Sequence, residues 1–481
     1  MLDIPFQIKY NYLNKDCMKV KTMDINFMSD AVNILSTRLE ERNHIDPLFY
    51  EKYNVKRGLR NADGSGVLAG LSNVCSVRGY MMNDAEKFPI DGQLLYRGYD
   101  IKDLVTNCEK ENRFAYEEVC WLLIFGTLPT EKQLAIFKST LGELRELPEY
   151  FAEDMILKAP SRNIMNKLAR SVLALYSYDD NPDDISTVNI LRQILEIIAR
   201  LPTILAYSYQ AKRRHYDKKS MYFHPIDPKH STAEMILSSI RADRQFTAEE
   251  AKLLDICLTL HAEHGGGNNS TFSARVLASS GTDTYAVISS AIGSLKGPRH
   301  GGANAKFADM LDHIEENVKD WHNDDEIASY LERIVKREVG DKSGLVYGMG
   351  HAVYTKSDPR AVILKKYAKK LCEEKGFGDE FELLERIERL TPEVFHRVKG
   401  SDKTLCANID FYSGIVYKTL GIPRELFTPL FAVARCAGWS AHRIEETMTG
   451  KRIIRPAYKS TFSHELSYIP MADRDKFYGK D

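Results

Sequence analysis

The segment GMGHAVYTKSDPR, which begins at Gly348, places a histidine in a glycine-hinged loop and an arginine nine residues further on. Glycines can adopt positive φ and allow a ligand to approach the backbone. His351 can donate a hydrogen bond to an oxygen, and Arg360 can bind a carboxylate through two parallel hydrogen bonds. The pattern indicates a site for a carboxylate-bearing carbonyl compound, and an ordinary turn is the alternative.

Two further histidines stand where a helical pattern runs into a glycine-rich segment. His264 opens the stretch HGGGNNS, and His300 lies in GPRHGGAN among residues too small to cover it. His261 and His264 have a spacing that can bind a metal, but Cys and His are not clustered nearby, and a helix C-terminus also favours histidine. We therefore predict no metal and expect His264 to open a polar ligand loop. For His300, a structural turn remains the alternative.

One carboxylate and two arginines complete the candidate residues. Asp410 in NIDFYSG has apolar and aromatic neighbours, which would raise its pKa and make it a usable base near neutrality; it could also cap the following helix. Arg435 lies in an apolar helix with Phe431 and Trp439 four residues away on either side, so a buried carboxylate from protein or ligand is expected beside it. Arg455 in IIRP is less informative, because a basic residue before a proline is usually on the surface.

Helical periodicity dominates the chain and places the histidines at helix ends. Thr247 and Glu250 form a capping box for a helix that ends at residues 265–267. A second helix runs from about Tyr285 to the Gly-Pro pair at 297–298. Both predicted helices lead directly into a segment that carries a candidate histidine.

Three other segments complete the predicted organisation. Thr428 caps a third helix, with Pro429 in its first turn. Strand alternation is rare, and the best candidate, residues 92–98, is expected to belong to a small hairpin near the N-terminus. Residues 320–403 are rich in charge and are expected to form solvated amphipathic helices of a smaller, more mobile domain.

The composition argues against several classes of function. The 481 residues include 66 Lys and Arg against 67 Asp and Glu, and nucleic-acid binding would need a clustered basic excess. The 8 cysteines include no Cys-x-x-Cys pair, so neither a zinc knuckle nor a disulfide framework is indicated. No apolar run reaches the roughly 18 residues of a membrane-spanning helix, and no export signal is recognisable. We expect a cytoplasmic protein with neither a nucleic-acid nor a membrane partner.

Taken together and in this order, the motifs resemble those of the citrate synthase family. The resemblance runs from about Gly92 to about Pro456 and includes LLYRGYDI near its start. Six ordered segments with compatible spacing are far more specific than any one of them. The matching segments are HAEHGGGN, GPRHGGAN, GMGHAVYTKSDPR, NIDFYSG, FAVAR and IIRP.

The resemblance implies a mainly α-helical, two-domain fold with a small N-terminal β-hairpin. It implies an obligate homodimer whose active site is shared across the interface. A large domain would span 1–300, a small mobile domain 301–418, and a return to the large domain with a C-terminal dimer arm 419–481. The first 28 or so residues contain three methionines after the first, so they are expected to form a flexible tail or to precede a later start codon.

The resemblance also implies an acyltransferase reaction, in which acetyl-CoA condenses with oxaloacetate and water to give citrate and CoA at entry to the tricarboxylic acid cycle. Asp410 would remove a methyl proton from acetyl-CoA. His300 would hydrogen-bond the thioester oxygen, and His351 would protonate the ketone oxygen of oxaloacetate. Acetyl-CoA is a substrate, and no cofactor is implied.

Substrate binding is also assigned by the resemblance. Arg57 and Lys356 are tentative contacts to CoA. Two positions depart from the family pattern. Many members have an acid where this chain has Gly265, and a basic residue that contacts CoA where it has Thr355. Lys356, which follows Thr355, could take over that contact. The residues expected to hold oxaloacetate are His264, Arg360, Arg435 and Arg455, the last reaching across the dimer interface.

Two other functions stay open. A 2-methylcitrate synthase shares these motifs and uses propionyl-CoA, and one methylene is worth only about 1–3 kcal/mol of discrimination. A non-catalytic regulator that binds CoA or a dicarboxylate on the same fold is the second alternative. Such a regulator would not need a base, whereas His300, His351 and Asp410 are all present.

Overall fold

The computed structural model describes residues 32–33, 35–36, 39, 43–61, 64–83, 86–400, 405–474 and 476. The tail predicted within the first 28 residues therefore lies outside the described residues. The chain divides into two units, one formed by Leu68–Arg455 and the other by the terminal segments Met1–Val67 and Pro456–Asp481. The predicted boundaries at 300 and 418 are internal to the first unit and stay predictions.

The terminal unit has little regular structure in its described part. Its elements are α2 (Leu48–Lys52) and the short 3₁₀ turns η1 (Arg57–Leu59) and η5 (Met471–Asp473). Large apolar side chains along its C-terminal segment are exposed, and Tyr458 is 95% exposed. The predicted CoA contact Arg57 belongs to this unit, where its guanidinium lies 4.4 Å from the ring centre of Tyr50.

A small antiparallel sheet begins the larger unit and confirms the predicted hairpin. Its strands are β1 (Cys75–Asn83), β2 (Glu86–Tyr96) and β3 (Tyr99–Asp100), in that order across the sheet. Residues 97 and 98 have positive φ and turn the chain from β2 into β3. The β1–β2 register shifts between Arg78 and Tyr80, which places a bulge at Gly79.

Helices form the rest of this unit. Short irregular turns separate some of them, including the π-helical turn η2 (Ala152–Leu157), η3 (Leu175–Tyr178) and η4 (Arg424–Leu426). The α-helices are α3 (Ile101–Lys110), α4 (Tyr116–Phe125), α5 (Glu131–Glu143), α6 (Ile164–Ala174), α7 (Thr187–His215), α8 (Thr232–Ile240), α9 (Ala248–His261), α10 (Asn269–Ser279), α11 (Thr284–Leu295), α12 (Ala303–Asn317), α13 (Asp324–Val335), α14 (Pro359–Glu374), α15 (Gly378–Lys399), α16 (Ile409–Thr419) and α17 (Phe427–Thr449).

Two of the three helices predicted from the sequence agree closely with the structure, and the third begins differently. The capping box of Thr247 and Glu250 starts α9, and α11 ends before the predicted Gly-Pro pair. The prediction that Thr428 caps α17 is wrong, because Leu426 is the N-cap and Thr428 lies inside the helix. The Thr428 hydroxyl donates instead to the carbonyl of Gly301, at 3.0 Å, and so joins α17 to the His300 turn.

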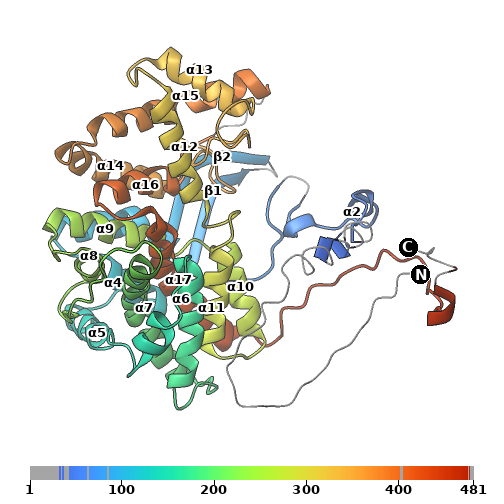
Figure 1. Ribbon diagram of the computed structural model, residues 1–481, viewed down its shortest axis with the longest axis horizontal. Coiled ribbons are helices and arrows are strands. Elements are labelled where there is room, and N and C mark those ends of the chain that lie inside the picture. The colour runs from blue at the N-terminus through green and yellow to red at the C-terminus, as the bar shows by residue number, and fades with distance from the viewer. Residues whose placement is uncertain are drawn as a thin grey trace, which may run out of the picture. The chain divides into compact units, whose positions relative to one another are not determined.

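Helix α17 is the centre around which the larger unit is packed. It contacts α4, α7, α9, α10 and α11, and Figure 1 shows these helices around it, with α12 to α16 gathered toward one end of the unit. The charge-rich stretch 320–403 forms α13, α14 and α15, as the amphipathic pattern predicts. The fold of this unit is mainly helical. Over the described ranges, no helix is both long and apolar enough to cross a membrane.

Candidate active site

The larger unit brings most of the predicted site residues together. Arg435 acts electrostatically on His264, His300 and Asp410. Arg360 acts on His264, on His351 and on Asp410. The gathered residues come from the segment after α9, the turn after α11, the loop before α14, the first turn of α14, the first turn of α16 and the middle of α17. They are His264, His300, His351, Arg360, Asp410 and Arg435.

The loop that carries His351 is hydrogen-bonded to the segment that leads to Asp410. Gly348 and Gly350 have φ of 80° and 92°, so the predicted glycine hinges occupy a region that other residues rarely adopt. The N–H of Gly350 donates to the carbonyl of Cys406 at 2.7 Å, and the N–H of Asn408 donates to that of Gly348 at 2.8 Å. This pairing fixes the loop of one candidate acid beside the candidate base.

The β1–β2 hairpin supports the other side of the same loop. The N–H of Gly92 donates to the carbonyl of Ser357 at 3.1 Å, and the Ser357 hydroxyl donates to Oδ1 of Asp91, also at 3.1 Å. A Cβ on Gly92 would lie 2.2 Å from the Ser357 carbonyl oxygen, and one on Gly79 would lie 2.3 Å from that of Val353. The hairpin and the loop therefore approach as closely as two backbones allow.

Hydrogen bonds fix the tautomer of His351. Its Nδ1 accepts from the backbone N–H groups of Val353 at 3.0 Å and Tyr354 at 3.1 Å, so the proton of the neutral ring is on Nε2. Burial, and then the nearby Arg360, lower the pKa of His351 to about 4. His351 is therefore a neutral donor at pH 7, and its ring lies 5.0 Å from that of His264.

His264 is a second neutral imidazole in this cluster. Its side chain is buried, and its Nε2 has no hydrogen-bond partner within the described part of the chain. Burial, and then the charge of Arg360, hold its pKa well below the usual value. A buried polar atom without a partner is costly, so a ligand oxygen or hydroxyl is the natural partner for it.

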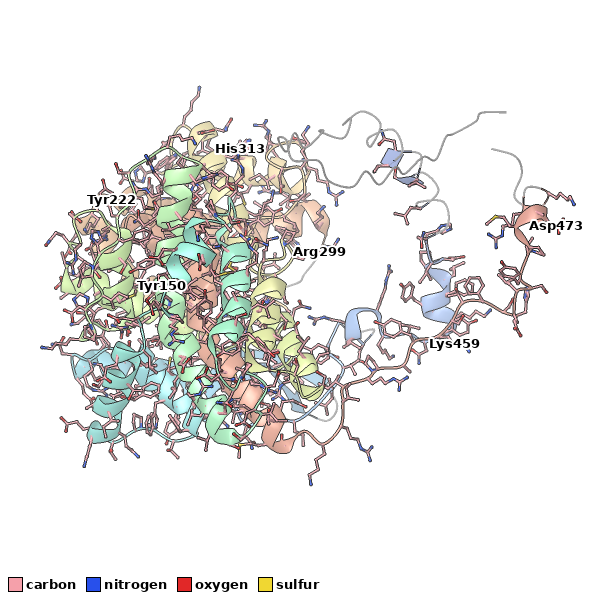
Figure 2. All side chains as sticks on the ribbon, turned by 60° about the horizontal axis from the view of Figure 1, so that its bottom comes forward. Tyr150, Tyr222, Arg299, His313, Lys459 and Asp473 are labelled. Carbon is pink, nitrogen blue, oxygen red and sulfur yellow. The ribbon has the colours of Figure 1, made fainter. Side chains whose placement is uncertain are left out.

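His300 stands in a tight turn whose geometry requires glycine. The N–H of Gly301 donates to the carbonyl of Leu295 at 2.9 Å, and a Cβ on Gly301 would lie 2.4 Å from that oxygen. Arg299, the preceding residue, is exposed at the surface (Figure 2), whereas His300 is only partly exposed. The small neighbours predicted to leave His300 uncovered are therefore also needed for the turn itself.

The Ser270 hydroxyl binds Nε2 of His300, at 3.0 Å. Its oxygen also accepts from Trp439 Nε1 at 3.1 Å, and its proton is donated to Asn268 Oδ1 at 2.9 Å. With that proton on Asn268, Nε2 of the neutral His300 ring donates to Ser270; Nδ1 becomes the donor when the hydroxyl proton turns from Asn268 to Nε2. Burial, and then Arg435, lower the pKa of His300 to about 4, so this ring too is neutral at pH 7.

Asp410 lies in the first turn of α16 but does not cap it. Asn408 is the cap, because its Oδ1 accepts from the N–H of Asp410 at 3.0 Å; the alternative that Asp410 is the cap is therefore wrong. Burial raises the pKa of Asp410 to about 6, although Arg360 and a hydrogen bond from Asn304 act to lower it. This carboxylate is ionised at neutral pH and basic enough to accept a proton.

The two predicted arginines of this cluster differ in how much of each guanidinium is free. Arg435 is fully buried, its Nε donates to the carbonyl of His261 at 2.5 Å, and its guanidinium lies 4.6 Å from the Phe431 ring centre. Its Nη1 and Nη2 have no partner in the described ranges. Arg360 donates both Nε and Nη2 to Asp358, so one bidentate face of its guanidinium is already occupied by protein.

Three predicted contacts are not part of this cluster. Arg455 is exposed in an extended segment after α17. Lys356 is exposed on the His351 loop, and the adjacent Thr355 has a buried hydroxyl with no partner among the described residues. Arg57 lies in the terminal unit described above. The proposed roles of Arg455, Lys356 and Arg57 stay predictions.

Sequence reasoning missed several residues that hold the predicted ones. Asp358 lies in the same motif as Arg360, and Glu263 in the same motif as His264. Their closeness in sequence to these predicted residues was the signal that could have found them. Ser270 and Asn304 occur two to four residues after glycine-rich stretches and gave no signal beyond their polarity. Gly265 stands where many family members have an acid. Its φ is 89°, a conformation that favours glycine, and its N–H donates to Oε1 of Glu263 at 2.5 Å.

Known proteins resemble this chain over most of its length. The profile of the family described as "Citrate synthase, C-terminal domain" matches residues 63–457. A citrate synthase of Synechocystis sp. is 36% identical over 415 residues, which cover 85% of this chain and 93% of that protein. One of Haloferax volcanii is 34% identical over 432 residues and covers 87% and 99%. A 2-methylcitrate synthase of Shewanella oneidensis is 32% identical over 381 residues and covers 79% and 92%.

Solved structures show the same fold. Citrate synthase of Thermoplasma acidophilum, in a ternary complex with carboxymethyl coenzyme A and oxaloacetate, has a TM-score of 0.70 and 26% identity and covers 87% of this chain and 99% of its own. Citrate synthase of Thermotoga maritima has a TM-score of 0.68 and 29% identity and covers 88% and 99%. Since the profile and these relatives extend over most of the chain, the protein belongs to the citrate synthase family.

Proposed function

We propose that the protein is a citrate synthase, which condenses acetyl-CoA with oxaloacetate and water to give citrate and CoA. The observation that carries this proposal is the proximity of Asp410, a carboxylate with a pKa of about 6, to Arg435, whose two terminal nitrogens are buried with no partner in the part of the chain that the structure describes. A base tuned toward neutrality suits proton removal. A buried, unpaired guanidinium suits a substrate that brings its own carboxylates.

The first step is removal of a proton from acetyl-CoA. Asp410 takes a proton from the methyl group, and negative charge develops on the thioester oxygen. His300 hydrogen-bonds that oxygen through Nδ1 once the Ser270 hydroxyl, 3.0 Å from Nε2, turns its proton from Asn268 to that nitrogen. A neutral donor held beside the thioester oxygen stabilises this charge, and the pKa of His300, near 4, keeps the ring neutral where Asp410 is ionised.

The second step forms the carbon–carbon bond. The methyl carbon attacks the ketone carbon of oxaloacetate, and His351 donates its Nε2 proton to the oxygen that becomes the citrate hydroxyl. Arg435, His264 and the remaining N–H groups of Arg360 bind the oxaloacetate carboxylates. Water then cleaves the thioester: its oxygen stays on the new carboxylate, one of its protons goes to the CoA thiol and the other to solvent. The proton that Asp410 took returns to Nε2 of His351. Each positioned acid or base contributes about 10²–10⁴-fold, and orientation of the two substrates supplies the rest.

The proposal includes the assembly and the CoA contacts. The protein acts as a cytoplasmic homodimer in which Arg455 binds oxaloacetate in the partner's site. Its exposure within one chain is consistent with a residue that acts across an interface. Lys356 contacts CoA, because Thr355 stands where many family members have the basic residue that makes this contact. Arg57 is a second CoA contact.

A second candidate is a 2-methylcitrate synthase. The observation that favours it is the similarity of this chain to the 2-methylcitrate synthase of Shewanella oneidensis. The two reactions differ by one methylene in the acyl pocket. A thiol-release assay with oxaloacetate and a panel of acyl-CoAs distinguishes them. A higher kcat/KM for acetyl-CoA than for propionyl-CoA supports the main proposal, and a large preference for propionyl-CoA refutes it. Absence of oxaloacetate-dependent thiol release would favour the non-catalytic regulator.

A further inference from the structure

A fully buried glutamate lies beside the site, and the proposed reaction gives it no role. Glu263 precedes His264 and has no exposed surface. Its Oε1 accepts from the N–H of Gly265 at 2.5 Å and from Nε2 of His442 at 3.1 Å, while its Oε2 has no partner within the described ranges. Burial alone would raise the pKa of Glu263, but His442 and then Arg435 bring it below its usual value, so the carboxylate is ionised.

This carboxylate is the counter-charge of Arg435. Burial lowers the pKa of Arg435, and Glu263 is the neighbour that opposes this most strongly. No hydrogen bond joins the two side chains; Glu263 Oε1 accepts instead from Gly265 and His442, which hold the carboxylate in place. Glu263 therefore offsets the burial of the Arg435 charge and still leaves Nη1 and Nη2 free for a ligand carboxylate.

His442 is held in one tautomer by a second arginine, Arg275. It is fully buried on α17, and its Nδ1 accepts from Nε of Arg275 at 3.0 Å. Because an arginine Nε–H can only donate, Nδ1 must carry a lone pair and the proton must be on Nε2, directed at Glu263. Arg275 is itself held by the carboxylates of Glu445 and Glu446. The ring thus has one protonation pattern and one orientation.

We propose that His442 is a positioning residue for oxaloacetate binding. Through its hydrogen bond to Glu263 it fixes the turn from His264 to Gly265 and keeps the Glu263 charge beside Arg435 without pairing to it. This inference rests on the proposed function for the identity of the ligand. It differs from a packing role because loss of the hydrogen bond frees Glu263 to pair with Arg435, which would block the carboxylate-binding nitrogens.

Two substitutions in the full-length protein test the geometry and the charge separately. His442→Leu removes the bond to Glu263, and we expect the Kd of oxaloacetate, measured by calorimetry, to rise about tenfold or more while the KM of acetyl-CoA stays within about twofold. His442→Gln keeps a donor for Glu263 and should restore affinity to within about threefold. Glu263→Gln keeps an acceptor for Gly265 but removes a negative charge from the anion site, so the Kd should fall at least threefold.

A matched control separates positioning from stability. Val433 is buried on the same helix and its side chain is not part of the relay, so Val433→Ala should lower the thermal stability without changing the Kd. An unchanged Kd in His442→Leu, or a Kd that rises in Glu263→Gln, would overturn the proposal; if His442→Leu does not fold, Glu263→Gln decides. Wild-type protein that binds oxaloacetate but releases no thiol contradicts the catalytic proposal alone, whereas wild-type protein that does not bind it contradicts both.

Discussion

Asp358 holds the guanidinium of Arg360, two residues further on, by two hydrogen bonds, from Nε to Oδ1 at 3.0 Å and from Nη2 to Oδ2 at 2.7 Å. Oδ1 also accepts the backbone N–H of Arg360 and caps α14. The two parallel bonds that the sequence suggested for a substrate are thus made to protein, and the N–H groups left for a ligand are the second one of Nη2 and the two of Nη1. Arg435, whose two terminal nitrogens have no partner among the described residues, offers the more open carboxylate fork.

This difference gives two expectations for Arg435→Met. The KM of oxaloacetate should rise by about 100-fold, because a desolvated charged pair is lost. The free protein should also unfold at a lower temperature, because the buried Glu263 carboxylate loses its counter-charge and removing one partner of a buried pair is destabilising. Steady-state kinetics and thermal unfolding without ligand measure the two effects. A KM within about threefold of wild type would show that Arg435 is mainly structural.

The base assignment predicts a separation of turnover from binding. Asp410→Asn keeps the size and the Asn304 contact but cannot accept a proton, so kcat should fall at least 100-fold. The Kd of oxaloacetate, measured by calorimetry, should change less than about fivefold. Glu393→Gln, at an exposed position of α15, serves as the matched control and should leave both values unchanged. Turnover close to wild type in Asp410→Asn would remove this residue from the mechanism.

The pKa of Asp410 also predicts the acid side of the pH profile. As the pH falls through about 6 the carboxylate takes up a proton and can no longer act as a base, so kcat/KM for acetyl-CoA should halve near pH 6 and level off above pH 7. The pKa values of His300 and His351, near 4, keep both rings neutral over this range. Circular dichroism at each pH excludes unfolding as the cause. A midpoint at pH 4 would argue against a buried base.

The close approach of the hairpin to the His351 loop predicts that a single methyl group impairs activity from outside the site. Gly92→Ala would place Cβ 2.2 Å from the Ser357 carbonyl oxygen, so the loop must move and kcat should fall about tenfold or more. Gly70→Ala is the control, because its Cβ would meet nothing within 4 Å, and its kinetics should match wild type. A wild-type kcat in Gly92→Ala would show that the loop position is not critical.

The sequence pointed to residues whose chemistry does not suit their local surroundings, and it did not point to polar residues in surroundings that suit them. A glycine-hinged histidine such as His351 and an arginine in an apolar helix such as Arg435 conflict with local expectation, so each pointed to a site. The N-cap of α17 was misplaced at Thr428, because a threonine before a proline has the same local pattern whether its hydroxyl caps the helix or binds a distant carbonyl. The relay from Arg275 to Glu263 joins residues far apart in the chain, and no local pattern contains that pairing.

Helix α17 carries Arg435, Trp439, His442 and Glu445 within three turns, and each contacts a different part of the stretch from the last residue of α9, His261, to Arg275 in α10. One inserted or deleted residue would rotate everything beyond it by about 100° and shift it by about 1.5 Å. The spacing from Arg435 to Glu445 is therefore fixed in length, although individual side chains can vary. Across divergent sequences, this stretch should align without gaps even where the loops on either side do not.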